Sequence, residues 1–409
     1  MNATLEYRIG DVFDRLAEIP DNSIDLIVSS PPFLALRSYL PDDHPDKHKE
    51  IGQEPTPAAF IDTHLALAAE YARVLAPHGT LCYEIGDTYS GAGGTTDKRT
   101  NTDGGNDLAP RGPRAGGPGY PLAKSMCLIP HMFTGSLAYG RNLLTGETSP
   151  AGEWRIRNVI CWARPNPPVG ALGDKFRPAT SYITVACKGK QRYFDLDAVR
   201  GPYSEKTNAR TAKGVDSRPN DVKTSPDGNS DTLAIINNEG AGAPPLDWHA
   251  DNHPEDGDWL WKLTTQPYKG SHFATYPMAL PKRLIEAMCP RKVCTVCGEP
   301  STRIAETING VADDPTERHD KNQRKVNSTT VNTWKQATGE TSTRSITLGW
   351  TDCGHDAWRT GIVLDPFGGS GTTAEAAQAV GRSAILIDLD ERNADLAQER
   401  VGMFLDVVA

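Results

Sequence analysis

Apolar and polar positions alternate along the chain in blocks that predict strands and helices in turn. A largely apolar run over residues 24–28 is typical of a strand buried on both faces of a parallel sheet. Residues 60–75 carry apolar side chains at helical spacing, and this pattern stops before Pro77 and Gly79, after which residues 80–85 predict another strand. The alternation predicts an α/β fold with a doubly wound, mostly parallel sheet.

The same pattern continues along the rest of the chain and is interrupted by polar stretches. Further predicted elements are a strand over 7–11, a short helix over 12–19, a helix over 122–139, and strands over 154–162 and 182–187. Polar, glycine-rich or otherwise irregular stretches cover residues 90–121, 205–258 and 307–345. The first stretch cannot bury enough surface to order itself, which predicts a mobile loop or a part that orders on a partner.

Composition narrows the class of protein only moderately. The 409 residues include 38% hydrophobic and 23% charged residues, which is ordinary for a soluble globular protein. No stretch has the length of a membrane-spanning helix and the start of the chain lacks a signal-peptide pattern, so we expect a cytoplasmic protein. A net charge of −9 argues mildly against non-specific coating of nucleic acid without excluding a DNA substrate.

A glycine-rich turn near the end of the chain predicts a nucleoside site. Residues 361–365 form a short apolar strand, and the sequence GGSGTT that begins at Gly368 leads into a helix of small residues. Glycine lets the backbone approach a ligand, and a helix N-terminus offers free N–H groups. Asp388 ends the next strand, 20 residues after Gly368, where an acid meets ribose hydroxyls in nucleoside-binding α/β folds. The turn lacks the lysine of a phosphate-binding loop and does not match GxGxxG, so a sulfonium nucleoside fits better than ATP or NAD; a plain turn is the alternative.

The string Ser30-Pro31-Pro32-Phe33 follows the predicted strand 24–28 and has the groups needed to bind an exocyclic amine. Such amines are poor nucleophiles because the nitrogen lone pair is delocalised, and two acceptors on the amine hydrogens would favour a tetrahedral, reactive nitrogen. Ser30 offers its hydroxyl oxygen and Pro31 its carbonyl, held in extended geometry by Pro32. Phe33 offers a flat face for a base to stack on. Taken alone, the string also fits an ordinary turn at a strand end.

The late cysteines predict a metal site. Cys294 and Cys297 have the spacing of a zinc knuckle, and Cys353 and His355 supply two more candidate ligands after the third polar stretch. Thiolates and an imidazole suit a closed, tetrahedral, structural zinc ion. Free thiols in a turn and a redox pair are the alternatives, and Cys289 is a rival ligand if His355 is not one.

These motifs together resemble those of the beta group of amino-methylating DNA methyltransferases, which use S-adenosylmethionine. The resemblance rests on SPPF at 30–33, HFATYP at 272–277 and DPFGGSGTT at 365–373, with further pieces over most of the chain. It implies that Asp11 lies near the adenine, that Asp388 holds the ribose, and that Phe273 and Pro277 close over the methionine part. It also implies that the methionine part is held by Asp365, Phe367, Gly368, Gly369, Ser370, Gly371 and Thr372.

The resemblance also implies a reaction. In this family SPP followed by Phe or Tyr is typical of cytosine-N4 enzymes, whereas a leading Asp or Asn is typical of adenine-N6 enzymes. We therefore expect methyl transfer to cytosine N4 in a specific double-stranded DNA site, with the base flipped out of the duplex and a restriction endonuclease as a candidate functional partner. Adenine-N6 methylation by the same fold stays open, as does a non-catalytic DNA-binding protein with a zinc module. A small-molecule or RNA methyltransferase would not need so long a polar middle.

The motifs divide the chain into four expected parts. These are a catalytic part over 1–200 with the loop 90–121, a target-recognition region over 201–265, a cofactor-binding part over 266–288 and 356–409, and a zinc-binding insertion over 289–355.

Overall fold

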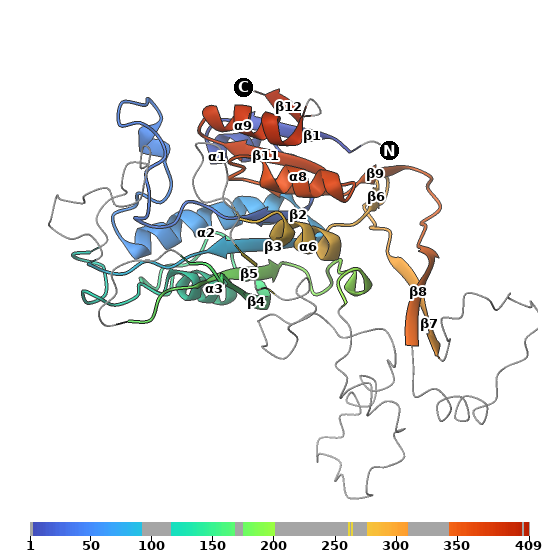
Figure 1. Ribbon diagram of the computed structural model, residues 1–409, viewed down its shortest axis with the longest axis horizontal. Coiled ribbons are helices and arrows are strands. Elements are labelled where there is room, and N and C mark those ends of the chain that lie inside the picture. The colour runs from blue at the N-terminus through green and yellow to red at the C-terminus, as the bar shows by residue number, and fades with distance from the viewer. Residues whose placement is uncertain are drawn as a thin grey trace, which may run out of the picture.

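One eight-stranded sheet forms the centre of the computed structural model, which describes residues 3–91, 116–167, 175–200, 261, 263–264, 276–309, 343–402 and 405–408 (Figure 1). The strands lie in the order β12-β1-β11-β10-β2-β3-β5-β4. Their bounds are β1 Leu5–Ile9, β2 Ile24–Ser29, β3 Leu75–Ile85, β4 Arg155–Ala163, β5 Thr180–Cys187, β10 Ile362–Asp365, β11 Ser383–Asp388 and β12 Leu405–Val408. All neighbours from β12 to β3 are parallel, whereas β5 runs antiparallel to both β3 and β4. The predicted mostly parallel α/β sheet is confirmed.

Helices cover both faces of this sheet, as a doubly wound fold requires. One face packs against α1 (Val12–Ala17), α2 (Pro57–Val74) and α3 (Ile129–Tyr139), whose apolar side chains share one buried cluster. The other face packs against α6 (Ala279–Met288), α8 (Thr372–Ala379) and α9 (Arg392–Val401), whose apolar side chains share a second cluster. The fold therefore has three layers, with the sheet in the middle.

Helix α3 is shorter than the sequence pattern predicts. It was expected over 122–139, but it begins at Ile129, because Leu128 adopts a left-handed conformation and Pro130 occupies the first turn. The Asp87 carboxylate accepts hydrogen bonds of 3.0 Å from the backbone N–H groups of Leu128 and Ile129. A side chain from another segment thus satisfies the first turn of the helix, which periodicity cannot reveal.

The third polar stretch, predicted as a loop over 307–345, has strands at both ends. Strands β7 (Arg303–Asn309) and β8 (Thr343–Trp350) form an antiparallel hairpin that stands away from the central sheet (Figure 1). Ile304 on β7 and Leu348 on β8 remain exposed, so the hairpin has a weak apolar pattern. At its base β6 (Lys292–Cys294) pairs with β9 (Trp358–Thr360), the strand that precedes β10. Two 3₁₀ turns, η1 (Lys47–Lys49) and η2 (Leu196–Ala198), complete the described elements.

The switch point of the sheet lies between β10 and β2. From β10 the chain proceeds to β11 on one side, and from β2 it proceeds to β3 on the other. Ligands of open α/β sheets bind outside the carboxyl ends of the strands at such a point. The strand before DPFGGSGTT and the strand before SPPF are therefore neighbours, although more than three hundred residues separate them.

Several sequence-based expectations fall outside the described residues. These are Phe273, the polar stretch 205–258 and most of the loop 90–121. Among the described helices, none is both long enough and apolar enough to cross a bilayer.

Candidate functional site

A cleft of about 940 Å³, including the part open to solvent, lies at the carboxyl ends of β1, β2, β10 and β11. Of the residues singled out from the sequence, the cleft is lined by Asp11, Ser30, Pro32, Asp365, Phe367, Gly368, Gly369, Ser370, Thr372 and Asp388. The structure thus brings the two motifs to one cavity.

Asp365 organises the turn after β10. Its carboxylate is buried, and one oxygen accepts hydrogen bonds from Ser29 Oγ at 2.6 Å and from the N–H of Phe367 at 3.1 Å. The other oxygen accepts from the Tyr276 hydroxyl at 3.0 Å and from Thr373 Oγ1. Burial raises the pKa of Asp365, and these donors oppose that rise. The carboxylate therefore holds the turn and the surrounding strands together.

The glycines of the turn have different structural roles. A Cβ on Gly368 would lie 2.7 Å from the Cβ of Leu386, so the backbone there packs directly on β11. Gly371 has a φ of +82°, and a Cβ on it would lie 2.9 Å from the Cβ of Ala397 in α9. Gly371 does not line the cleft; it allows α8 to approach α9 closely.

Asp388 forms the wall of the cleft at the end of β11. Its carboxylate accepts hydrogen bonds from the N–H of Gly369 at 2.8 Å, the N–H of Asp390 at 2.9 Å and Asn393 Nδ2 at 3.1 Å. Burial raises the pKa of Asp388 to about 6 although these donors oppose the rise. An ionised Asp388 retains acceptor capacity beyond these three bonds.

Asp11 lies beside Asp388 in the same cleft. Its side chain caps α1 by accepting a hydrogen bond of 2.9 Å from the N–H of Phe13. The preceding Gly10 donates its N–H to the carbonyl of Asp388 at 2.8 Å, which joins the ends of β1 and β11. The two acidic residues expected at the nucleoside therefore both line the cleft, beside the ends of neighbouring strands.

Ser30 presents its side chain to the cleft immediately after β2. Its hydroxyl donates a hydrogen bond to the carboxylate of Glu84, a buried residue near the end of β3. Burial raises the pKa of Glu84, and its hydrogen bond from Ser30 and the charge of Arg164 oppose the rise. The candidate amine acceptor thus has a buried carboxyl group directly behind it.

Of the other residues in the string 30–33, only Pro32 lines the cleft. Pro31 is buried and is not part of the lining. The ring of Phe33 packs on Gly86, where an added Cβ would lie 2.7 Å from Phe33 Cδ2. Phe33 also packs against the core that α2 and α3 share, and it is not among the residues that line the cleft.

Further residues line the cleft. The segment after SPPF, which the sequence did not mark, contributes Tyr39, Leu40, Lys49, Glu50 and Ile51, and the HFATYP string contributes Tyr276. The expected Pro277 is buried next to Tyr276 and does not line the cleft.

Contacts of Lys47 fix the segment over the cleft. Lys47 Nζ lies 2.7 Å from the Glu50 carboxylate and donates to the carbonyl of Leu40 at 2.6 Å. Arg392 of α9 donates to the carbonyl of Tyr39 at 3.1 Å. No periodic pattern marks this segment, so only the tertiary contacts identify it as part of the site.

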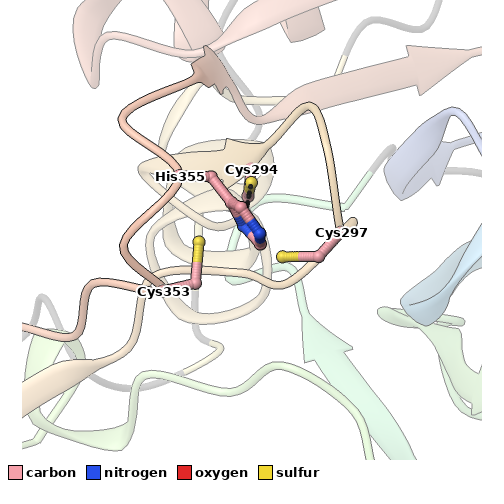
Figure 2. A group of neighbouring side chains, drawn as sticks. All are labelled: Cys294, Cys297, Cys353 and His355. Carbon is pink, nitrogen blue, oxygen red and sulfur yellow. Dashed lines mark hydrogen bonds between the residues drawn. The ribbon is translucent and has the colours of Figure 1, made fainter.

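The four predicted metal ligands also come together, away from the cleft. Their ligand atoms all lie within 4.8 Å of one another, and Figure 2 shows the side chains of Cys294, Cys297, Cys353 and His355 converging. The rival Cys289 is fully buried in the core around α6 and is not part of this group.

Comparisons with known proteins agree with this architecture. A family model described as DNA methylase matches residues 24–293 and 344–399. The chain is 22% identical over 397 residues to the type II methyltransferase M.SmaI of Serratia marcescens, covering 96% of this chain and 89% of that protein. It is 29% identical over 195 residues to the type II methyltransferase M.SfiI of Streptomyces fimbriatus, covering 48% of this chain and 38% of that protein.

The similarity to solved structures is low. The PvuII DNA methyltransferase (cytosine-N4-specific) aligns with 99% of this chain and 96% of its own, at 13% identity and a TM-score of 0.44. The family model, in contrast, matches most of the sequence, including both motifs at the cleft. The chain therefore belongs to the DNA methylase family and is a DNA methyltransferase.

Proposed function

We propose that this chain transfers a methyl group from S-adenosylmethionine to the exocyclic N4 amine of cytosine in a specific double-stranded DNA site. The observation that carries the proposal is the position of Ser30, whose hydroxyl lies in the cleft lined by the glycine-rich turn and is bound from behind by Glu84. A methyl donor and an amine acceptor would meet in this cleft. Family membership favours such an enzyme over a non-catalytic DNA-binding protein.

The residues of the cleft fit S-adenosylmethionine. Asp388 offers carboxylate oxygens to ribose hydroxyls, and Asp11, which lines the same cleft, is the proposed neighbour of the adenine. The turn from Phe367 to Thr372 offers backbone groups to the methionine part, since its glycines bring the main chain to the cleft surface. When bound, S-adenosylmethionine supplies a methyl group on a sulfonium, which is already activated for transfer.

Ser30 and Pro31 would prepare the amine. Because the Ser30 hydroxyl donates its hydrogen to Glu84, the lone pairs of its oxygen remain free to accept from an amine hydrogen. The Pro31 carbonyl would accept the second hydrogen, which favours the tetrahedral nitrogen of the transition state. As the nitrogen bonds to the methyl carbon, the bond between that carbon and the sulfonium sulfur would break and leave a neutral thioether, and the nitrogen must then lose one proton. The Ser30 hydroxyl gives that proton a short route to Glu84, whose raised pKa suits it to accept and release protons.

Access to this cleft requires the target base to leave the duplex, so the proposal includes base flipping. We assign recognition of the DNA sequence to the region 201–265, and a restriction endonuclease remains a candidate functional partner. The choice of cytosine rests on the SPPF string. Adenine-N6 methylation is the second candidate, because both reactions need only an acceptor at Ser30. The Cys and His cluster is compatible with zinc, and a closed set of four protein ligands leaves no position for the reaction.

The Ser30→Ala variant tests the amine role directly. Incorporation of labelled methyl groups into DNA should fall strongly, by about 10²-fold or more, because a transition-state acceptor is removed. The affinity for S-adenosylmethionine should stay close to that of the unmodified chain, as measured by equilibrium titration. Ser23→Ala is the control, since the exposed Ser23 hydroxyl bonds only locally to the carbonyl of Pro20. Unchanged turnover in Ser30→Ala would refute the amine role of Ser30.

A further inference from the structure

We infer that Cys294, Cys297, Cys353 and His355 bind one structural Zn²⁺ ion, which joins both ends of the β7–β8 hairpin to the catalytic core. The first two ligands lie on and just after β6, before the hairpin, and the other two lie between the hairpin and β9. A metal at this point would fasten two segments that are more than fifty residues apart in the sequence.

The geometry of the group fits the bond lengths of zinc. Zn–S and Zn–N bonds of about 2.3 and 2.05 Å at a tetrahedral angle place the two ligand atoms about 3.5 Å apart. Cys294 Sγ lies 3.5 Å from Nδ1 of His355. The remaining ligand atoms all fall within 4.8 Å of one another, so small side-chain rotations would complete a tetrahedron. Three thiolates and an imidazole select zinc over magnesium or calcium, which prefer oxygen ligands.

The backbone around the first two cysteines is arranged as a metal-binding turn. The N–H of Val296 points at Cys294 Sγ at a distance of 3.4 Å, which would stabilise a thiolate ligand. The N–H of Gly298 donates to the carbonyl of Cys294 at 3.0 Å, and Gly298 has a φ of +74° that closes the turn. This conformation directs both sulfur atoms toward one side.

The second pair of ligands is held against the first by main-chain contacts. The N–H of Thr295 donates to the carbonyl of Ala357 at 2.9 Å, and β6 pairs with β9. Gly354, with a φ of +79°, lies between Cys353 and His355, and its N–H donates to the Asp352 carboxylate at 2.8 Å. Two separate loops are therefore both shaped to present their ligands to one point.

The hairpin has few other attachments to the core among the described residues. At its base Arg303 forms a two-pronged ion pair with Asp195, with nitrogen to oxygen distances of 2.7 to 3.1 Å. Within the hairpin, the Arg303 guanidinium stacks over Trp350, 4.8 Å from its ring centre. Metal coordination would add a second fixed point beside this ion pair. The family model does not match residues 294–343, which fits an insertion that carries its own means of stabilisation.

Metal analysis of the full-length chain tests the inference. Chain purified under reducing conditions without chelator should contain about one zinc ion per molecule, and Cys353→Ser and His355→Ala should reduce this to background. Cys161→Ser is the matched control, because Cys161 is half-buried in β4, outside the group, and its replacement should leave the zinc content unchanged. A chain without zinc, or an equal loss in Cys161→Ser, would overturn the inference.

A cobalt titration needs no variant and so does not depend on how the variants fold. Metal-free chain titrated with Co²⁺ should develop thiolate charge-transfer and intense d–d bands, the signature of tetrahedral coordination by sulfur and nitrogen. Added Zn²⁺ should abolish these bands. An octahedral cobalt spectrum, or a disulfide between Cys294 and Cys297 found by mass spectrometry of the freshly purified chain, would contradict a zinc site.

Discussion

The hydroxyl of Ser29 donates a hydrogen bond of 2.6 Å to the buried carboxylate of Asp365, which lies 336 residues later in the chain. Ser29 ends β2 directly before Ser30, and Asp365 ends β10 directly before the glycine-rich turn. The bond therefore locks the amine-binding string and the cofactor turn in one relative position. Burial of both groups excludes water from competing for it.

Ser29→Ala should weaken both stability and cofactor binding. The substitution removes one donor from the buried Asp365, which should lower the free energy of unfolding by about 1–3 kcal/mol. The turn would also lose one of the bonds that fix it, so the dissociation constant of S-adenosylmethionine should rise. Denaturant unfolding and ligand titration measure the two effects. Ser23→Ala should change neither, and an equal effect of the two variants would argue against the lock.

Glu84→Gln should distinguish two roles of Glu84: positioning the Ser30 hydroxyl and accepting the proton that the amine loses. The amide oxygen can still accept the hydrogen bond from Ser30, but glutamine cannot take up a proton. We expect turnover to fall by about 10²-fold while cofactor affinity is retained. Because burial raises the pKa of Glu84, turnover of the unmodified chain should decline as pH falls and Glu84 becomes protonated. The acid limb of the pH profile should be absent in Glu84→Gln; an identical limb in both proteins would remove Glu84 from the proton route.

Cofactor affinity should depend on pH through Asp388. Its pKa is raised to about 6 by burial, so the carboxylate is ionised at neutral pH and becomes protonated as pH falls below 6. Since an ionised carboxylate is the better acceptor for ribose hydroxyls, affinity should decline through that range. Asp388→Asn should bind S-adenosylmethionine more weakly at neutral pH and with little dependence on pH. A variant with the parent affinity at pH 7.5, about 1.5 units above the pKa, would exclude the ribose role.

Asp388 should also make folding stability depend on pH, and with the opposite sign to cofactor affinity. In the absence of cofactor the folded-state pKa of Asp388 exceeds its ordinary value of 3.8, so the folded chain binds the proton more tightly than the unfolded chain. Its stabilising contribution is complete below pH 3.8 and is lost as pH rises through about 6. The difference in unfolding free energy between the unmodified chain and Asp388→Asn should follow this trend.

Gly86→Ala should disturb the amine end through Phe33. An added Cβ would lie 2.7 Å from Phe33 Cδ2, so the ring must move from the position it has directly after Pro32. Overpacking of this kind should cost about 1–3 kcal/mol of stability and should lower turnover more than cofactor affinity. Gly349→Ala in β8 is the control, because a Cβ there meets nothing within 4 Å. Comparable losses in both variants would show that glycine replacement alone causes the effect.

The sequence predicted the parts of the site that depend on strand ends and short motifs. Ser30, Asp365 and Asp388 each terminate or follow an apolar strand, and parallel strands necessarily bring their carboxyl ends to one edge. Glu84 escaped notice because a single acid near the end of a strand carries no local pattern; its burial arises only when β5 pairs with β3. The part of the cleft wall that contains Tyr39 could not be predicted from the sequence either, because tertiary contacts with Lys47 and Arg392 hold it in place.

Packing explains where some of the predicted site residues lie. Gly371, expected at the cofactor, does not line the cleft, and its lack of a side chain lets α8 approach α9 closely. Tyr276, rather than Pro277, faces the cleft, because the Tyr276 hydroxyl reaches the Asp365 carboxylate. The stretch 307–345 was predicted as a loop, yet its two ends belong to β7 and β8; the described side chains of these strands are too exposed to show an apolar pattern.

The identity of the methylated base tests the central claim most directly. DNA from a host that expresses the chain, with a Ser30→Ala host as control, can be digested to nucleosides and analysed by mass spectrometry. The account predicts N4-methylcytosine in DNA from the first host and none above background in the control. N6-methyladenine without N4-methylcytosine would contradict it.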